Sequence, residues 1–188
     1  MRTARLDLRP WSDEDAPAFH RIWGDPRVVF WGPAADVAAS LAMIQRTRAR
    51  CAGRPAPVGW HALVERTTGE LVGNVVLQPA PFAPGDLELG WHLRHDRWGH
   101  GYATEAAAAV AAQAFATLGV GHLVCAILPS NARSQAVARR LGFAVTAHDV
   151  PHGGLPHDVW TLPAPARSRP PGAAPRAPAA APEDDARP

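Results

Sequence analysis

Residues 98–106, WGHGYATEA, place two glycines directly ahead of an alanine-rich stretch that is typical of a helix. The first N–H groups of a helix have no partner inside the helix, and the helix dipole adds about half a positive charge at that end. Gly99 and Gly101 carry no side chain and Ala103 only a small one, so a ligand can approach the backbone closely. A phosphate or pyrophosphate fits such a helix end. The loop therefore predicts an anion site, and a tight turn without a ligand is the alternative.

Two common nucleotide-binding loops do not match this stretch. A dinucleotide-binding G-x-G-x-x-G loop needs a third glycine or an alanine where Thr104 stands. A P-loop needs a lysine before its serine or threonine, and all 19 basic residues of this chain are arginines. Both readings are therefore excluded, and the chain also has no lysine of its own for a Schiff base.

Nine histidines raise the question of a metal site. His92 and His95 lie at the end of an expected strand, whereas His148, His152 and His157 lie in a segment with glycines and prolines. Neither group has the spacing of a common metal site, so we expect no bound metal.

The pattern of apolar and polar residues predicts the elements that position the glycine loop. Ser12 is expected to cap a first helix that breaks near 24–26. Further helices are expected over 35–50, 104–118 and 131–143, and strands over 4–11, 59–66, 70–78, 86–93, 122–128, 144–150 and 157–162. This order predicts an α/β fold, of the mixed-sheet (α+β) kind, with helices on both faces.

A change in composition predicts where the folded domain ends. Residues 1–162 are expected to form one domain, because they contain all the predicted helices and strands. Residues 163–188 are mostly proline and alanine with scattered arginine. Such a segment cannot bury enough apolar surface to offset the entropy of ordering it, so we expect a disordered tail.

Composition and charge exclude several classes of partner. The net charge is only +2, which gives no electrostatic case for nucleic acid. Cys51 and Cys125 stand alone and do not indicate a disulfide framework. The N-terminus lacks the apolar core of a signal peptide, and no apolar run is long enough to cross a bilayer. We therefore expect a soluble cytoplasmic protein without a membrane partner.

The glycine loop and the later segment NARSQAVARRLGF together resemble the acetyl-CoA-binding core of the GNAT superfamily of N-acetyltransferases. Within it, the chain is similar to the branch of the ribosomal-protein N-terminal acetyltransferases, which favours G-x-G-Y-A-T-E-A and N-x-x-S-x-x-V…L-G-F. The resemblance covers nearly all of residues 1–162, including the D-P-x-V turn at 25–28. It departs at Trp98, because the superfamily usually has Gln or Arg there.

The resemblance implies how acetyl-CoA, the expected co-substrate, is held. The strand 86–93 would splay from the strand 122–128, with coenzyme A in the wedge between them. Trp91, His92 and Leu93 would offer backbone partners to the pantetheine arm. Asn131 would cap its helix, contact the pantetheine amide, or do both. The pyrophosphate would be bound by the backbone of the loop, namely Trp98, Gly99, His100, Gly101, Tyr102, Ala103 and Thr104.

The resemblance also implies the catalytic residues. Glu88 on the splayed strand is the candidate base, acting directly or through water, and a structural pairing is its alternative. His92 shares a strand face with Glu88 and is the reserve base. By resemblance, Ser134 is the candidate acid for the leaving thiolate. Many other members of the superfamily use a tyrosine, but the only tyrosine here, Tyr102, lies in the phosphate loop.

The function that follows is transfer of an acetyl group from acetyl-CoA to a primary amine, without a covalent enzyme intermediate. The acceptor expected first is a protein N-terminal α-amine. The alternatives are a small amine, amino acid or antibiotic, a larger acyl group, and a non-catalytic acyl-CoA-binding domain. The resemblance places the acceptor side in residues 20–60 and the loop 79–85. Trp23, Trp31 and Trp60 would form its rim or belong to the core. A homodimer is one open alternative for the assembly.

Overall fold

The structure is a computed structural model and describes residues 1–30 and 32–165. Trp31 and the predicted tail beyond residue 165 lie outside the described residues. The strands are β1 (Leu6–Pro10), β2 (Gly59–Glu65), β3 (Leu71–Pro79), β4 (Leu87–Leu93), β5 (His122–Ile127), β6 (Ala144–His152) and β7 (Leu155–Pro163). The helices are α1 (Ala16–Trp23), α2 (Val37–Cys51), α3 (Tyr102–Leu118) and α4 (Ala132–Leu141), with short 3-10 turns η1 (Asp13–Asp15) and η2 (His95–Arg97).

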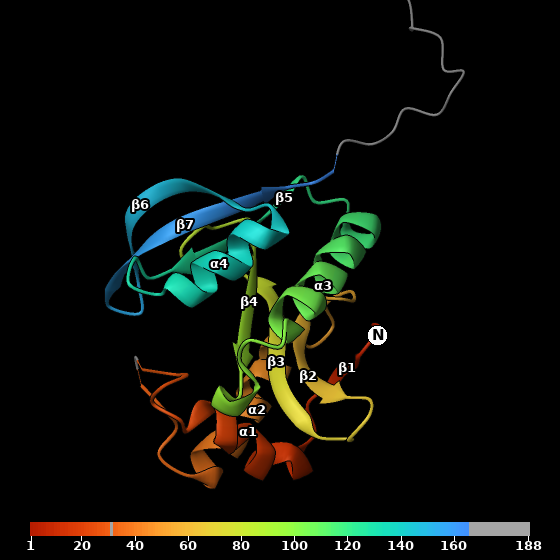
Figure 1. The fold of residues 1–188 in the computed structure, drawn as a ribbon. Coiled ribbons are helices and arrows are strands. Elements are labelled where there is room, and N and C mark those ends of the chain that lie inside the picture. Colours follow the sequence, from red (N-terminus) through yellow and green to blue (C-terminus); the bar gives the residue numbers. More distant parts are fainter. Residues whose placement is uncertain (31, 166–188) are drawn as a thin grey trace, which may run out of the picture.

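The described strands form one sheet in the order β1-β2-β3-β4-β5-β7-β6 (Figure 1). Every neighbouring pair is antiparallel except β4 and β5, which run parallel. β3 and β4 stay in register over seven residue pairs, whereas β4 and β5 share the single pair Glu88–Val124. The predicted mixed sheet and the splay of its two central strands are therefore confirmed.

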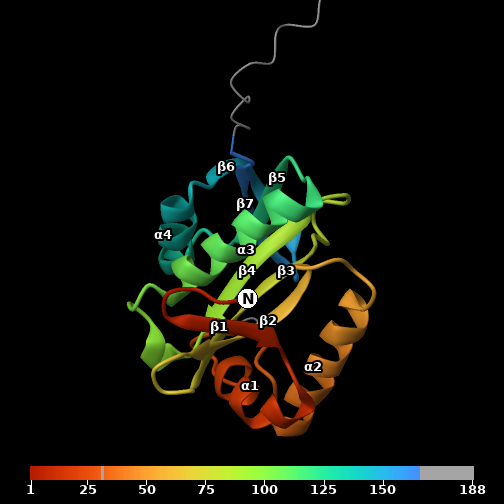
Figure 2. The same cartoon turned by 90° about the vertical axis from the view of Figure 1, so that its right-hand side faces the viewer.

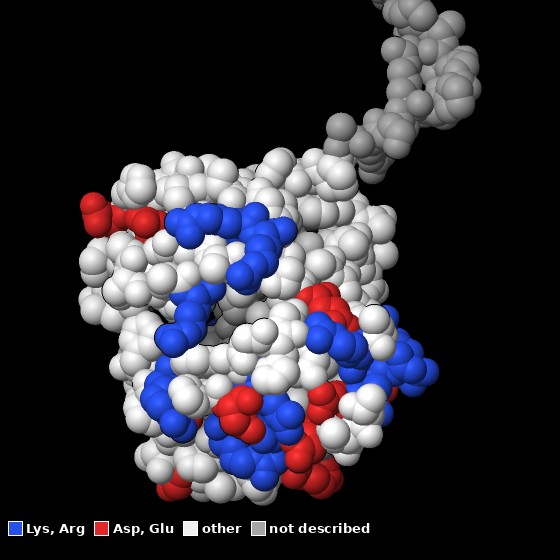
Figure 3. Space-filling model, in the orientation of Figure 1, with Lys and Arg blue, Asp and Glu red and all other residues white. Residues whose placement is uncertain are grey.

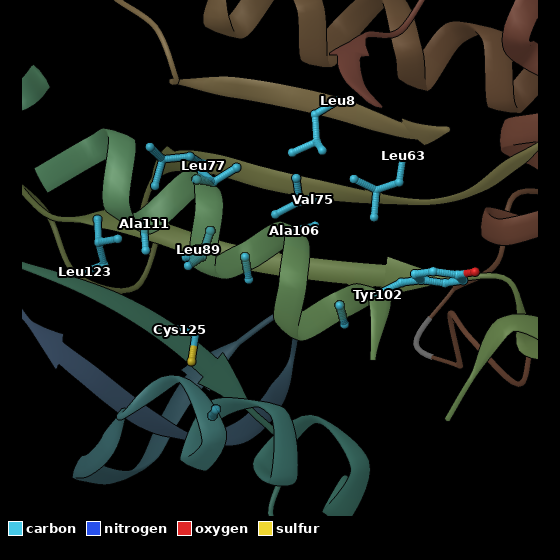
Figure 4. Packing of buried hydrophobic residues seen from close by; sticks show 14 of the residues in the cluster. Leu8, Leu63, Val75, Leu77, Leu89, Tyr102, Ala106, Ala111, Leu123 and Cys125 are labelled. Atoms are coloured by element: carbon cyan, nitrogen blue, oxygen red, sulfur yellow. The ribbon is translucent and has the colours of Figure 1, made fainter. Parts of the chain in front are cut away.

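The larger hydrophobic cluster lies between the sheet and the helices α3 and α4 (Figure 4). α3 contributes mainly alanines, which let the helix lie close to the leucines and valines of the strands. Leu63, Val75 and Leu89 reach this cluster from three successive strands, and each is fully buried. This packing fixes the start of α3 relative to β4.

The opposite face of the sheet carries α1 and α2, so the predicted helices on both faces are confirmed (Figure 2). Here the cluster is aromatic: Phe19 packs edge-on against Trp11 at 4.9 Å and stacks on Trp23 at 5.7 Å, between ring centroids. In β2, Leu63 belongs to the first cluster and Ala62 to this one. This alternation is what a strand with both faces buried requires.

Two helix starts differ from the predicted ones. α3 begins at Tyr102 instead of Thr104, because Gly101 takes the left-handed conformation (φ 80°) and turns the chain directly into the helix. After Ser12 the chain first makes the 3-10 turn η1, where the Asp15 carboxylate accepts a hydrogen bond from the Ser12 backbone N–H at 2.9 Å.

None of the helices in residues 1–30 and 32–165 has the length and apolar character needed to span a membrane.

Candidate active site

A cavity of about 1160 Å³ opens where β4 separates from β5. Pockets for small ligands measure about 300–1,000 Å³, so this one has room for a long ligand together with a second one. Its described lining comes from α1 and the segment after it, from β2 to β5, from the glycine loop, from α3 and α4, and from β6, β7 and the turn between them. Figure 3 shows arginine side chains gathered around a hollow on this face of the molecule. The two ends of the cavity differ in chemistry.

One end is formed by the glycine loop and the start of α3. Gly99 and Gly101 both have positive φ, 81° and 80°, which side chains rarely adopt. A Cβ at Gly99 would have no atom within 4 Å, so this backbone is open. No side chain caps the N-terminus of α3, and Ala103 and Thr104 of its first turn line the cavity. The N–H groups of this turn therefore suit an anionic ligand, as a pyrophosphate-bearing cofactor requires.

Hydrogen bonds and ring contacts hold this loop in place. Arg5 donates to the Glu105 carboxylate at 2.7 Å and to the His100 backbone carbonyl at 2.8 Å. The Tyr102 hydroxyl donates to Glu65, and the His100 ring stacks on the Tyr102 ring. His100 and Tyr102 are not among the described residues that line the cavity. Only their backbone is therefore available for the predicted cofactor contact.

Trp98 lines the cavity beside the loop and is held on two sides. Its indole Nε1 donates to the Leu93 carbonyl at 3.0 Å, and its ring lies 4.6 Å from the His95 ring. The guanidinium of Arg133, from α4, lies over the same ring at 4.8 Å from its centroid. The indole thus forms part of the wall at the anion end.

The middle of the cavity runs along β4. Trp91, His92 and Leu93 all line it, and they are in register with β3 on one side only. On the other side the separation of β5 leaves this backbone edge without a strand partner among the described pairings. An extended ligand can therefore add to this edge through backbone hydrogen bonds, as the predicted pantetheine contact needs.

Glu88 stands at the point where β4 and β5 part. Its carboxylate accepts a hydrogen bond from the Gln78 side-chain amide at 3.0 Å, and Gln78 in turn accepts one from the Trp60 indole at 2.9 Å. Burial raises the pKa of Glu88 above its ordinary value, and the Gln78 hydrogen bond and the charge of His157 lower it in part. A desolvated carboxylate with a raised pKa is suited to proton transfer near neutral pH.

Replacing Gln78 by methionine is expected to move the acidic limb of the activity profile to higher pH. The Gln78 amide stabilises the ionised carboxylate, so its loss raises the pKa of Glu88 further. The ionised base then forms only at a higher pH. The check is kcat/KM for the amine between pH 5 and pH 9, where the variant should lose activity at the acidic end and approach the wild type at the basic end. An equal loss at every pH would contradict this role.

His92 lies on the same face of β4 as Glu88, among aromatic rings. The ring centroids of Trp23 and Trp60 are 4.7 Å and 6.4 Å from that of His92. Burial lowers the pKa of His92 to about 4, so the imidazole is neutral at physiological pH. It is consequently a weak base. With Trp23 and Trp60 it forms an aromatic wall of the cavity.

Asn131 and Ser134 line the cavity at the start of α4. The Asn131 side-chain oxygen accepts a hydrogen bond from the Ser134 backbone N–H at 3.1 Å, which is the predicted helix cap. This cap places Ser134 in the first turn. Ser134 and Glu88 therefore lie in the walls of one cavity, as the predicted acid and base require.

Cys125 of β5 also lines the cavity, so its thiol has to be considered as a possible nucleophile. Burial, with the charge of Glu88, raises the pKa of its thiol well above the usual range. A thiol held in the protonated form is a poor nucleophile, so this cysteine is not suited to carry an acyl group.

The histidine cluster predicted near the C-terminus divides into two parts. His148 pairs with Asp158 at 2.7 Å, whereas His152 and His157 lie side by side, with ring centroids 5.2 Å apart, and line the cavity. In the part of the chain that the structure describes, no three His, Cys, Asp or Glu side chains are grouped so that they could hold a metal ion.

Several lining residues were not identified from the sequence. Gln78 lies directly opposite Glu88 in the β3–β4 register, which a count along the two strands reveals. Arg133 sits inside the recognised N-x-x-S segment, but only its contact with Trp98 draws attention to it. The loop 79–85 was expected near the acceptor. It instead packs against Val124 and Val159 and contributes none of the described lining. Further such residues are Arg27, Phe30, Arg140, His152 and His157.

Comparison with known proteins finds acetyltransferases that are similar to this chain. A curated relative from Aspergillus fumigatus, FsC-acetyl coenzyme A-N(2)-transacetylase, is 28% identical over 172 residues, which cover 82% of this chain and 71% of the relative. The crystal structure of an acetyltransferase from Agrobacterium tumefaciens is 32% identical, with a TM-score of 0.72 over 86% of this chain and 92% of the other. A protein from Vibrio cholerae named as a ribosomal-protein-serine acetyltransferase is 25% identical, with a TM-score of 0.71 over 86% and 95%.

The family comparison matches most of the chain. The model of the acetyltransferase (GNAT) domain matches residues 5–144, a span that runs from β1 to the start of β6 and includes the glycine loop and the start of α4. This span includes most of the residues that line the cavity. Because the match extends over well over half of the chain, the chain belongs to the GNAT acetyltransferases and is an acetyl-CoA-dependent N-acetyltransferase.

Proposed function

We propose that this enzyme acetylates the N-terminal α-amine of a protein, with Glu88 as the base and Ser134 as the acid. The observation that carries the proposal is the position of the Glu88 carboxylate. It is desolvated, held by Gln78, and faces a cavity whose opposite end is suited to the anionic part of acetyl-CoA. A carboxylate of this kind attracts an ammonium group and can take its proton.

The chemistry requires two protons to leave the acceptor nitrogen and one to reach the leaving thiolate, and it needs no covalent enzyme intermediate. Glu88 takes a proton from the acceptor ammonium, and the free amine nitrogen then attacks the thioester carbonyl. The new N–C bond forms, the C–S bond breaks, and the electron pair leaves with sulfur. Ser134 donates its proton to the thiolate and regains one from the amide-forming nitrogen through solvent. The protonated state of Cys125 supports this direct route.

The acceptor end supports a chain end as the substrate. Phe30, which is 47% exposed, lines the same cavity as the aromatic wall of Trp23, Trp60 and His92. An extended peptide can place its first side chain against such rings while its α-amine reaches Glu88. The name of the Vibrio cholerae neighbour, a ribosomal-protein-serine acetyltransferase, supports the same acceptor class.

A small-molecule amine is the second candidate. The Aspergillus fumigatus relative is named for transfer to an N(2) position of FsC, at a similar level of identity. The same aromatic wall can hold an apolar or aromatic body next to the amine. In both cases Glu88 has the same role.

The acceptor is decided by a panel of amines assayed with acetyl-CoA for released thiol. The panel pairs each peptide that has a free N-terminus with the same peptide blocked at its N-terminus and carrying one lysine, and adds amino acids and polyamines. We expect turnover of the free peptides and none of the blocked ones. Turnover of small amines alone would replace the protein acceptor by the second candidate. Thiol release from no amine, with acetyl-CoA still raising the Tm, would mean a non-catalytic binding domain.

A cytoplasmic location and a homodimer stay predictions of this proposal.

A further inference from the structure

The glycine loop at the anion end of the cavity, residues 98–104, contains no arginine or lysine. The residues of this loop that line the cavity offer backbone N–H groups and uncharged side chains: Trp98, Gly99, Gly101, Ala103 and Thr104. The His100 imidazole stacks on the Tyr102 ring, and His100 is not among the described residues that line the cavity. A diphosphate carries two negative charges, so a cation from another element would complete the site.

Arg133, in the first turn of α4, is positioned to supply this cation. Its guanidinium lies 4.8 Å from the centroid of the Trp98 ring, and the residue lines the same cavity as Gly99, Gly101 and Ala103. Guanidinium groups stack on aromatic faces and keep their N–H edges available. The indole below it is fixed through Nε1 to the Leu93 carbonyl. Trp98 is therefore a rigid platform that holds the arginine at the loop.

The charge of Arg133 is also available for a ligand. Arg5, Arg27 and Arg94 are each paired with a carboxylate. No described carboxylate forms an ion pair with Arg133. An unpaired guanidinium beside open helix N–H groups is a strong partner for phosphate oxygens, which it can contact with two parallel N–H donors.

We infer that Arg133 binds the diphosphate of coenzyme A and that Trp98 positions it, so that a charge absent from the loop is supplied from α4. The inference rests on the acetyl-CoA site and does not depend on which amine is acetylated. It assigns to Trp98 a positioning role, because the indole lies under the Arg133 guanidinium.

The test is equilibrium binding by calorimetry, without turnover. Arg133→Gln should weaken binding of CoA about ten- to a hundredfold, the effect of losing a charge-assisted hydrogen bond. The same loss should occur with dephospho-CoA, which lacks the ribose phosphate but keeps the diphosphate. In a Trp98→Leu background the Arg133→Gln change should cost less, because the platform is already gone.

Arg139 provides a matched control on the same helix. It also stacks on a tryptophan, Trp160, at 5.2 Å, but it is not among the described lining of the cavity. Arg139→Gln should bind CoA like the wild type. The inference is overturned if Arg133→Gln binds CoA normally, if its defect disappears with dephospho-CoA, or if Arg139→Gln is equally impaired. Absence of CoA binding by the wild type would instead overturn the cofactor site itself.

Discussion

Glu88→Gln is expected to lower kcat for acetyl transfer by about a hundredfold or more, the usual contribution of a positioned general base. Glutamine keeps the shape and polarity of the side chain but cannot accept the ammonium proton. The affinity for CoA should stay within about twofold of the wild type, because Glu88 lies away from the glycine loop that binds the anion. The measurements are steady-state kinetics with the best acceptor of the panel and calorimetric titration with CoA. Weaker CoA binding with unchanged kcat would remove Glu88 from the role of base.

The same substitution should not destabilise the fold at alkaline pH. Burial raises the pKa of Glu88 in the folded state above that in the unfolded chain, so the folded state loses stability as pH rises through this interval. Glutamine has no charge to desolvate. The Tm of the variant relative to the wild type should therefore increase between pH 5 and pH 8 in thermal unfolding. A relative Tm that falls with pH would indicate that the carboxylate is a structural partner.

Ser134→Ala is expected to lower kcat by about a hundredfold if its hydroxyl protonates the leaving thiolate. The helix should remain intact, because the cap of α4 uses the Ser134 backbone N–H and not the hydroxyl. The Tm and the CoA affinity should accordingly be close to those of the wild type. The measurements are kcat from thiol release, calorimetric CoA binding and thermal unfolding.

Ser130 gives the matched control for this variant. It also lines the cavity but precedes the Asn131 cap, and no proton transfer is assigned to it. Ser130→Ala should retain kcat within about twofold. Equal losses for the two serines would mean that the cavity wall tolerates neither change, and full activity of Ser134→Ala would leave water as the acid.

Most of the fold could be predicted from local patterns in the sequence. Hydrophobic periodicity located the described α-helices and strands to within a few residues, because apolar residues recur where most of these elements pack against their neighbours. The start of α3 was placed two residues late, since the conformation of Gly101 follows from tertiary contacts of the loop that no single residue type specifies.

The site was harder to predict where it depends on side chains from different elements. Glu88 could be named from its place on the expected splayed strand and Ser134 from the N-x-x-S motif, and the structure puts both in one cavity. Gln78 required the β3–β4 register, and Arg133 required the approach of α4 to the loop. The departure at Trp98 was visible in the sequence, but its physical meaning depends on the guanidinium that stacks on it.

The central claim is direct transfer from acetyl-CoA to an amine within this cavity, and a single-turnover experiment tests it. The enzyme is mixed in excess with acetyl-CoA labelled in the acetyl group and with the best acceptor, and the label is followed in donor, amine and protein. We expect the label to pass from the donor to the amine, with no label on the protein, and about a hundredfold more slowly with Glu88→Gln. Label that reaches the protein before the amine, or stays on bound donor with every amine, would contradict the account.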